Sequence, residues 1–388
     1  MAAVEVQYEG WFSRILGSIK SVLFGGLLVL VAVPLLWWNE GRAVQTAKSL
    51  EQGAGEVVSV AADRVDPANE RTLVHVSGQA VAASTPEDPI FGVRAEALRL
   101  RRAVEMFQWR EHERTEERKK LGGGKERRTT YNYKAEWTES HVDSSRFKEP
   151  GHSNPPGLPY PSETFDAEAK LGAFTLIPEQ LAELDDFTPL PPPEAALGKQ
   201  PPPGYAPPRA MGSALYLAVQ GGVAPTAGSP AIGDVRVRFE SVPEGPVSVV
   251  AVQNGESFAP WQAPAGDAVL LVAAGSKTAD QMFAKAQADN RALTWVLRLL
   301  GFVFMWVGWG LVFRPVAVVA DVIPFVGSIL GFGVAALGFV LAGLGSSVII
   351  AMAWIFYRPL LGITLLLLVG GVVGAVWYAG RQRQLARA

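Results

Sequence analysis

The chain has 388 residues, of which 49% are apolar and 19% are charged, and its formal net charge is -2. This balance argues against a broad surface for nucleic acid or for acidic substrates. Because the chain contains no cysteine, disulfides, zinc–thiolate sites and thiolate catalysis are excluded.

The first long apolar run covers residues 21–38 and would be about 27 Å long as a helix, close to the thickness of the hydrocarbon core of a bilayer. It ends in Trp37 and Trp38, which suit a membrane interface, and no small-residue cleavage pattern follows. We therefore expect a retained transmembrane helix at 21–38, with residues 1–20 as a cytoplasmic segment before it.

Residues 39–291 form a long polar region without a run that could cross a bilayer. Short segments that are rich in β-branched residues and bounded by Gly, Pro or Asn predict strands in this region. The predicted strands are 56–60, 72–80, 215–220, 234–240, 247–254 and 268–273. A region of this size suffices for one or two compact domains, so we expect a β-rich domain at 39–291.

A long hairpin at residues 98–142 is the clearest element of this region. A turn centred on Gly123 would place Trp109 opposite Trp137, and aromatic cross-strand pairs of this kind fix register. The alternative is a helix over 110–120 capped by the glycines, since Arg, Glu and Lys are good helix formers. The Thr, Tyr and Trp residues of the second arm favour the hairpin.

The chain changes character between residues 151 and 208. Loop chemistry at 151–156 is followed by a predicted helix around 178–186. Residues 189–208 contain two Pro-Pro-Pro triplets, which favour a stiff, exposed loop outside any sheet interior. Partner binding is the alternative use of such a proline-rich segment.

A helical pattern begins at Ser276 and continues without a break into a second span at 292–313. One continuous helix would couple the polar domain mechanically to the membrane. Arg298 lies about one turn inside this span, where it can extend to the interface. The uncharged stretch that follows would be about 54 Å long as one helix, too long for a single upright span. We expect it to divide into an interfacial link at 314–326 and a third span at 327–356.

A turn at Tyr357-Arg358-Pro359 would return the chain as a fourth span at 360–378, followed by a basic tail at 379–388. Four spans place both termini on one side, and the Arg and Lys residues of the head, the link and the tail indicate that this side is cytoplasmic. The predicted fold is an α+β membrane protein. It has four transmembrane helices, one N-terminal and three C-terminal, and a large β-rich extracytoplasmic domain between the first and the second.

Several stretches resemble the LUMA (transmembrane protein 43) family, and they occur in the family's order. They are Asn39-Glu40-Gly41-Arg42-Ala43 after the first span, the segment from Arg102 to Trp109 that contains Glu105, Tyr131-x-Tyr133 followed by Glu136-Trp137, Gly151-His152-x-Asn154-Pro155, the residues Asn290, Thr294 and Trp295, and Phe356-Tyr357-Arg358-Pro359-Leu360. Together they cover most of the chain, and none of them is a catalytic signature.

The resemblance implies four membrane passes, a large extracytoplasmic domain and a scaffold or membrane-organising role. Eukaryotic members lie in the endoplasmic reticulum and inner nuclear membrane, where they self-associate and contact emerin and lamins. The proline-rich insertion at 189–208 departs from the family pattern. Because the Ala, Gly and Arg bias suggests a bacterial member, we expect a bacterial inner-membrane protein with a periplasmic domain; a eukaryotic source would imply the endoplasmic reticulum or inner nuclear membrane.

Candidate catalytic groups are sparse. The four histidines show no metal-ligand spacing, and no Gly-x-Ser-x-Gly, P-loop or dinucleotide motif occurs. His152 is the best candidate for a catalytic histidine, although hydrogen bonding to the loop near Asn154 is the simpler use. We therefore expect no enzyme, no metal and no cofactor, with an extracytoplasmic hydrolase as the weakest alternative.

Four glycines of the C-terminal spans, Gly327, Gly331, Gly370 and Gly374, form two Gly-x-x-x-Gly pairs that let helix backbones approach closely. They would serve packing within the chain or self-association.

The expected function is a non-enzymatic, self-associating integral membrane scaffold, with lipid or small-ligand binding as the alternative. Glu40 and Arg42 could bind lipid headgroups or form a local ion pair at the membrane surface. The expected partners are membrane lipids, further copies of the chain and other membrane proteins, but no nucleic acid.

Overall fold

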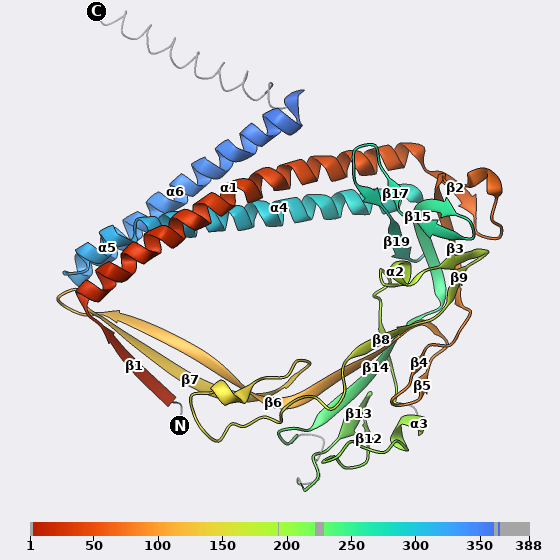
Figure 1. The fold of residues 1–388 in the computed structure, drawn as a ribbon, viewed down its shortest axis with the longest axis horizontal. Helices are drawn as coiled ribbons and strands as arrows, with labels where there is room; N and C mark the ends of the chain where they lie inside the picture. Colours follow the sequence, from red (N-terminus) through yellow and green to blue (C-terminus); the bar gives the residue numbers. More distant parts are fainter. Residues whose placement is uncertain (1–2, 193, 222–228, 361–363, 365–388) are drawn as a thin grey trace, which may run out of the picture.

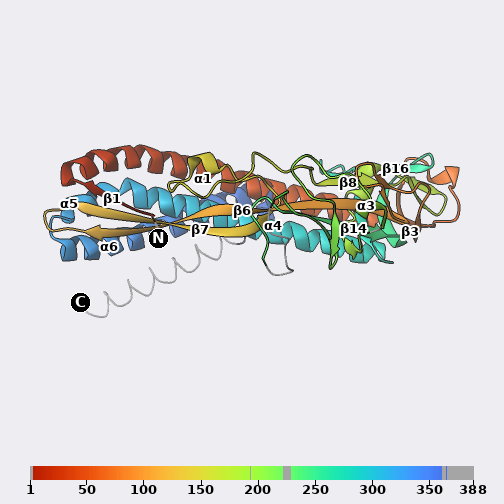
Figure 2. The same ribbon diagram turned by 90° about the horizontal axis from the view of Figure 1, so that it is seen from below.

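The computed structural model describes residues 3–192, 194–221, 229–360 and 364. Within them, long helices form one limb of the molecule, two β-sheets lie at one end, and a β-hairpin returns from the sheets to the far end of the helices (Figure 1). The helical limb and the hairpin limb meet at both ends, so the molecule has the shape of a ring. Figure 2 shows that this ring is much thinner than it is wide.

Three helices of the described chain are long and apolar enough to cross a membrane. The helical elements are α1 (Trp11–Glu56), α2 (Pro178–Leu181), α3 (Glu194–Leu197), α4 (Ala279–Val312), α5 (Arg314–Ala320) and α6 (Pro324–Tyr357), with 3₁₀ turns η1 (Pro67–Asn69) and η2 (Ser144–Arg146). The predicted unbroken helix from the polar domain into the second span is confirmed as α4. The predicted fourth span at 360–378 lies outside the described residues, apart from Leu360 and Thr364.

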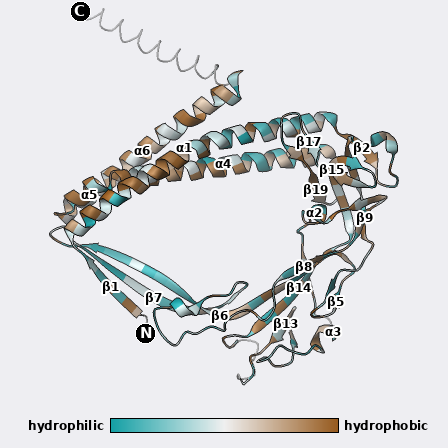
Figure 3. Cartoon of the chain, in the orientation of Figure 1, coloured by the Kyte–Doolittle hydropathy of each residue, from teal (hydrophilic) through white to brown (hydrophobic). Residues whose placement is uncertain are grey.

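Helix α1 is much longer than the span predicted at 21–38, and it continues for 18 residues into the region predicted as β-rich. Its buried positions in this second half include Ala43, Val44, Leu50 and Gly53, which recur at helical spacing. Of these, Ala43, Leu50 and Gly53 contact α4, and the two helices run side by side to the sheets (Figure 1). In both helices, the half that lies toward α5 is more hydrophobic than the half that lies toward the sheets (Figure 3).

Close approach of α1 and α4 depends on glycine. A Cβ atom on Gly25 would lie 2.6 Å from the carbonyl oxygen of Gly308, and a Cβ on Gly301 would lie 2.5 Å from the Leu36 side chain. Such distances leave no room for a larger residue, as expected where membrane helices pack through small residues. These glycines were not among those predicted from the Gly-x-x-x-Gly pattern.

In the described part of the β-rich region there are two large sheets and two small strand pairs. The first sheet has the order β1 (Ala3–Glu9), β7 (Lys125–Thr138), β6 (Ala97–Lys119), β14 (Val235–Pro243), β13 (Ala214–Leu217) and β12 (Arg209–Met211), with β8 (Glu163–Asp166) on β6 and β11 (Thr188–Leu190) on β14. The second has the order β10 (Phe174–Leu176), β9 (Ala169–Leu171), β3 (Leu73–Ala82), β15 (Gly245–Asn254) and β16 (Ser257–Ala259), with β19 (Leu271–Ala274) on β15 and β2 (Val58–Ala61) on β3. The small pairs are β4 (Glu87–Asp88) with β5 (Val93–Arg94), and β17 (Trp261–Gln262) with β18 (Ala268–Val269).

The helices are anchored to the sheets by a hydrophobic cluster of their own. Leu50 of α1 and Met282 and Phe283 of α4 pack with Val250 of the second sheet and with Trp261. Because all five side chains are buried, the ends of the two helices are fixed to the sheets by apolar contacts.

The predicted hairpin is confirmed as β6 and β7, and the alternative of a helix over 110–120 is wrong. Its predicted register is also wrong by two residues: Trp109 faces Ala135, and Trp137 faces Phe107. The turn is centred on Gly122, because Lys119 faces Lys125. Gly122 and Gly123 both adopt positive φ, at 84° and 78°, as such a tight turn requires.

The proline-rich segment at 189–208 is not a free exposed loop. Pro189 lies in β11 opposite Glu240 of β14. Ala196 of α3 is fully buried in the core of the first sheet, and Leu197 and Tyr205 pack against that core. The prolines are compatible with this sheet because β11 is a short edge strand.

The N-terminal strand β1 pairs with β7 along its whole length, from Ala3 opposite Tyr131 to Glu9 opposite Lys125. The tip of the hairpin reaches the link after α5, where the Gly122 amide donates to the Val322 carbonyl oxygen at 3.2 Å. These contacts join β1, within the predicted cytoplasmic segment, and the link to a region that is predicted to lie on the other side of a bilayer. One chain cannot keep this pairing and that two-sided arrangement at the same time.

Candidate functional site

A polar junction forms where α1, α4 and α6 meet, at the end of their apolar segments. Its members are Asn39, Glu40, Gly41 and Arg42 of α1, Asn290, Thr294 and Arg298 of α4, and Trp354 and Tyr357 of α6. Their polar side chains are held by one another, so we name this group the helix junction.

Glu40 is the centre of the helix junction and is only 1% exposed. Arg298 donates to both of its carboxylate oxygens, at 2.6 and 2.8 Å, and the indole N–H of Trp354 donates to Oε2 at 2.8 Å. The Arg298 guanidinium also lies 4.8 Å from the centre of the Trp295 ring. The sequence predicts that Arg298 extends to the membrane interface. In the structure it binds Glu40 instead.

Asn39, Arg42, Asn290 and Thr294 form the second half of the junction. The fully buried Asn39 donates to the Thr294 carbonyl oxygen at 3.1 Å, and Asn290 donates to the Ala43 carbonyl oxygen at 3.0 Å. Arg42 donates to the Asn290 side-chain oxygen at 3.0 Å and to the Thr294 hydroxyl at 3.1 Å. Side chains on each helix thus hold the other helix at its backbone, which fixes the register between α1 and α4.

Gly41 allows α6 to join this assembly. A Cβ atom there would lie 2.7 Å from the ring of Tyr357. The Tyr357 ring also lies 5.9 Å from that of Trp37. Arg358 caps α6, with its amide donating to the Trp354 carbonyl oxygen at 2.7 Å, and Pro359 follows directly.

A second cluster joins the loop at 151–155 to the base of the hairpin. Asn154 accepts from the Trp109 amide at 2.7 Å, and its side-chain nitrogen donates to the carbonyl oxygens of Trp109 at 2.9 Å and Val142 at 3.1 Å. The side chain of Asn154 therefore acts as a strand partner for β6. Gly151 has a positive φ of 99°, and Pro155 accepts from His141 at 2.7 Å.

His152 lies between aromatic rings. It stacks on Tyr133 with the ring centres 4.0 Å apart and meets the Trp109 ring edge-on at 4.7 Å. Its Nδ1 is buried without a hydrogen-bond partner in the described chain, so the expected loop hydrogen bond is made by Asn154 instead. Burial and the Glu111 carboxylate, which accepts from the Tyr133 hydroxyl, raise the pKa of Tyr133.

Glu105 and Trp137 belong to a neighbouring group on the first sheet. Glu105 accepts from Arg236 at 2.5 and 3.0 Å and lies 3.1 Å from Arg238. The Arg236 guanidinium lies 4.5 Å from the centre of the Trp137 ring. Glu105 therefore holds β6 to β14, and Trp137 of β7 contacts β14 across the intervening strand β6.

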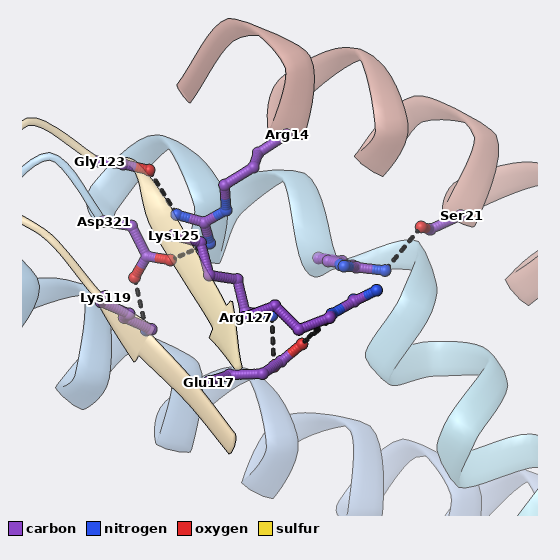
Figure 4. A network of polar contacts seen from close by, with 9 residues as sticks. Arg14, Ser21, Glu117, Lys119, Gly123, Lys125, Arg127 and Asp321 are labelled. Atoms are coloured by element: carbon purple, nitrogen blue, oxygen red, sulfur yellow. Dashed lines mark hydrogen bonds and ion pairs between the residues drawn. The ribbon is translucent and has the colours of Figure 1, made fainter. Parts of the chain in front are cut away.

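A third polar network closes the ring at the tip of the hairpin (Figure 4). The Asp321 carboxylate, 2% exposed, accepts from Arg14 and from Lys119, each at 2.5 Å, and Arg14 also donates to the Gly123 carbonyl oxygen. Burial raises the pKa of Asp321, but the bonds from Lys119 and Arg14 outweigh it and hold that pKa below its usual value. Gly327 gives Asp321 its space, because a Cβ there would overlap the carboxylate, whereas a Cβ on Gly331 would meet no atom within 4 Å.

These clusters bind and position chain segments and contain no reactive constellation. Among the described residues, no three His, Asp or Glu side chains are placed to hold a metal ion. The sequence identified most members of the helix junction from their family motifs. It missed Arg298 and Trp354 as partners of Glu40, because those pairs are separated by hundreds of residues.

Comparisons with known proteins agree with the motif resemblance. The family model described as Transmembrane protein 43 matches residues 106–359. Transmembrane protein 43 of Rattus norvegicus is 32% identical over 364 residues, covering 90% of this chain and 88% of its own length. The Homo sapiens protein is 31% identical over 366 residues with the same coverage, and the Drosophila melanogaster homolog is 28% identical, covering 92% of this chain and 93% of its own length. No solved structure matches the chain. The expected bacterial source is not supported, since these relatives are all animal proteins.

Proposed function

Because the chain belongs to the transmembrane protein 43 (LUMA) family, we propose that it is a non-enzymatic, multi-pass membrane scaffold that presents its β-rich domain at a fixed position on the membrane. The domain lies on the extracytoplasmic side in this proposal. Further copies of the chain and other membrane proteins are its partners.

The helix junction is the observation that carries this proposal. A buried carboxylate bound by an arginine and an indole N–H is a costly arrangement unless every group is paired, and here the pairing links three helices. Near the junction the apolar segments of α1 and α4 give way to polar segments that reach the sheets. It therefore suits the transmission of position and orientation, which is what a scaffold requires.

Self-association is the part of the proposal that α6 supports. Its apolar residues are exposed around the helix, including Phe325, Ile329 and Phe332. Gly331 and Gly333 both have open space where a side chain would lie. A helix of a second copy could approach closely at Gly331, within the Gly-x-x-x-Gly pattern that begins at Gly327.

Cross-linking and light scattering of the purified protein in detergent test this proposal. We expect discrete multimers for the unaltered chain and a shift to monomers for Gly331→Leu. Gly333→Leu, which lies on another face of the same helix, is the matched control and should remain multimeric. A monodisperse monomer for the unaltered chain would refute the self-association.

A groove beside the helix junction favours lipid binding as a second candidate function. It measures about 580 Å³ and is lined by aromatic and cationic residues that suit a headgroup at a membrane surface. They include Trp38, Arg42, Lys48, Phe356 and Tyr357. Native mass spectrometry of the unaltered protein should retain a phospholipid that is lost in Lys48→Ala, and equal retention by both would count against this site.

A further inference from the structure

A groove beside the polar half of α4 contains an unpaired strand edge. It measures about 710 Å³, and its walls are β19 with Leu270, the first turns of α4, and the loop at 183–186. The α4 wall contains Gln281, Met282 and Lys285. A strand, a helix and a loop thus enclose one open channel.

The outer edge of β19 is free along its length. In the described chain β19 pairs only with β15, and no backbone group of residues 270–274 bonds to anything outside that ladder. The Gly275 amide donates to the Pro246 carbonyl oxygen, which makes these two residues a hydrogen-bonded pair. Because such pairs alternate along an antiparallel ladder, the backbone groups of Val272 and Ala274 point away from β15 and into the groove.

This edge lacks three of the protections that proteins build into exposed strands. It carries no proline, no bulge and no charged side chain between Leu270 and Ala274. The side chains of β19 pack on both faces of the strand: Val272 packs against one hydrophobic core, and Leu271 and Ala273 pack against another. Packing on both faces therefore holds the backbone of β19 in an extended form that can accept another strand.

The groove carries a negative charge. Four carboxylates line it, those of Glu183, Asp185, Asp186 and Asp289, against two lysines, so its net charge is -2. One lysine, Lys285, is already paired with Asp289 at 2.8 Å. The exposed loop carboxylates are therefore left to attract cations.

We propose that this groove binds an extended, basic segment of a partner protein, which adds a strand to the free edge of β19. The backbone groups of Val272 and Ala274 supply the main-chain hydrogen bonds, and α4 forms the side wall. The carboxylates of the loop at 183–186 favour Arg or Lys in the incoming strand. This surface goes beyond the scaffold proposal, because it names where a partner binds and what chemistry that partner has.

Fluorescence polarisation with the full-length protein in detergent tests the inference. The probe is a fluorescein-labelled peptide of alternating Arg and Val, and its matched control alternates Glu and Val. We expect the basic peptide to bind at least about tenfold more tightly than the acidic one. Equal affinity for the two peptides would overturn the charge argument.

Two variants separate the contributions of backbone and charge. Ala274→Pro removes one outward N–H donor at the exposed end of the strand, and loss of one such bond should weaken binding about 3- to 10-fold. The double variant Asp185→Asn with Asp186→Asn should weaken the basic peptide by a similar factor. Asp63→Asn, an exposed aspartate outside the groove, should leave binding unchanged.

Hydrogen exchange on the unaltered protein keeps the test independent of any folding defect in Ala274→Pro. Bound basic peptide should slow exchange of the Val272 and Ala274 amides. Protection at the free edge of β6 instead, with no change in β19, would overturn the proposal. Self-association tested through Gly331 uses a different surface, so either result can fail without the other.

Discussion

At the scale of single residues, Glu40 is the residue of the helix junction on which the contact between three helices depends. Its carboxylate has three hydrogen bonds to side chains of two other helices, and almost none of it is exposed. Pairing of this kind contributes little net stability compared with an apolar core, but removal of one partner leaves the other buried and uncompensated.

Glu40→Gln should therefore destabilise the protein by about 3 kcal/mol, because Arg298 would remain mostly buried without a counter-charge. Chemical unfolding in detergent, followed by tryptophan fluorescence, measures the change. Glu51→Gln, an exposed glutamate on the same helix, is the control and should change stability by less than about 0.5 kcal/mol. Equal stability of the two variants would mean that the ion pair does not join the helices.

Gly41→Ala should destabilise the packing of α6 by about 1–3 kcal/mol, because the new methyl group would overlap the Tyr357 ring. Gly55→Ala makes the same change in α1 where there is open space, and it should be neutral or stabilising by up to about 1 kcal/mol. Thermal unfolding of the two variants checks this difference in sign. A harmless Gly41→Ala would show that Tyr357 does not lie against α1.

At the scale of elements, the loop at 151–155 substitutes for a missing strand at the base of the hairpin. The free side of β6 has no strand partner at Trp109 in the described chain, and the amide group of Asn154 satisfies both backbone groups of that residue. His152 adds stacking between the two arms through Tyr133 and Trp109. The family motif in this loop thus has a structural explanation that requires no catalysis.

Asn154→Ala should cost about 1–3 kcal/mol, since it leaves two backbone groups of Trp109 without partners. Hydrogen exchange at the Trp109 amide should rise strongly, whereas exchange in the second sheet should not. Asn132→Ala, at an exposed position of β7, is the matched control. Unchanged exchange at Trp109 would contradict the role assigned to Asn154.

The elements also show what could be predicted from sequence. The hairpin, the long strands β3, β14 and β15 and the unbroken α4 follow from local composition and periodicity, whereas many of the short strands were not predicted. The register error of two residues has a physical origin: a slip of two keeps every side chain on its own face, so alternation cannot detect it. The partners of Glu40 and the packing of Ala196 depend on contacts between distant segments, which a local pattern does not contain.

At the scale of the whole molecule, the two limbs of the ring suit different surroundings: the hairpin limb suits water and the helical limb suits the hydrocarbon core of a bilayer. Thirteen charged residues lie from Arg110 to Arg128 on the hairpin limb, whereas α1, α4 and α6 each contain an apolar segment long enough to cross a membrane. Placing the hairpin limb in hydrocarbon would cost tens of kcal/mol, at about 3 kcal/mol per charge. The contacts that close the ring are one short strand pair and a few polar bonds, which cannot offset that cost.

We therefore expect the ring to be open when the helices span a bilayer, with β1 released from β7. The absence of native cysteine makes the measurement direct. In sealed vesicles, an impermeant maleimide should label Tyr8→Cys from one face, and Thr115→Cys and Asp63→Cys from the other. Labelling of all three from the same face would refute the four-span arrangement.

The continuous helices α1 and α4 connect the bilayer to the sheets like two rods. Their stiffness has a consequence for how the protein responds to the membrane. Past the helix junction, α1 continues for 14 residues and α4 for 11, so the longer of the two reaches about 21 Å toward the sheets. If a thinner bilayer made the rods lean by about 10°, the sheets would swing sideways by about 4 Å. A change in lipid composition that alters bilayer thickness would then displace the β-rich domain sideways, because the two helices act as a lever.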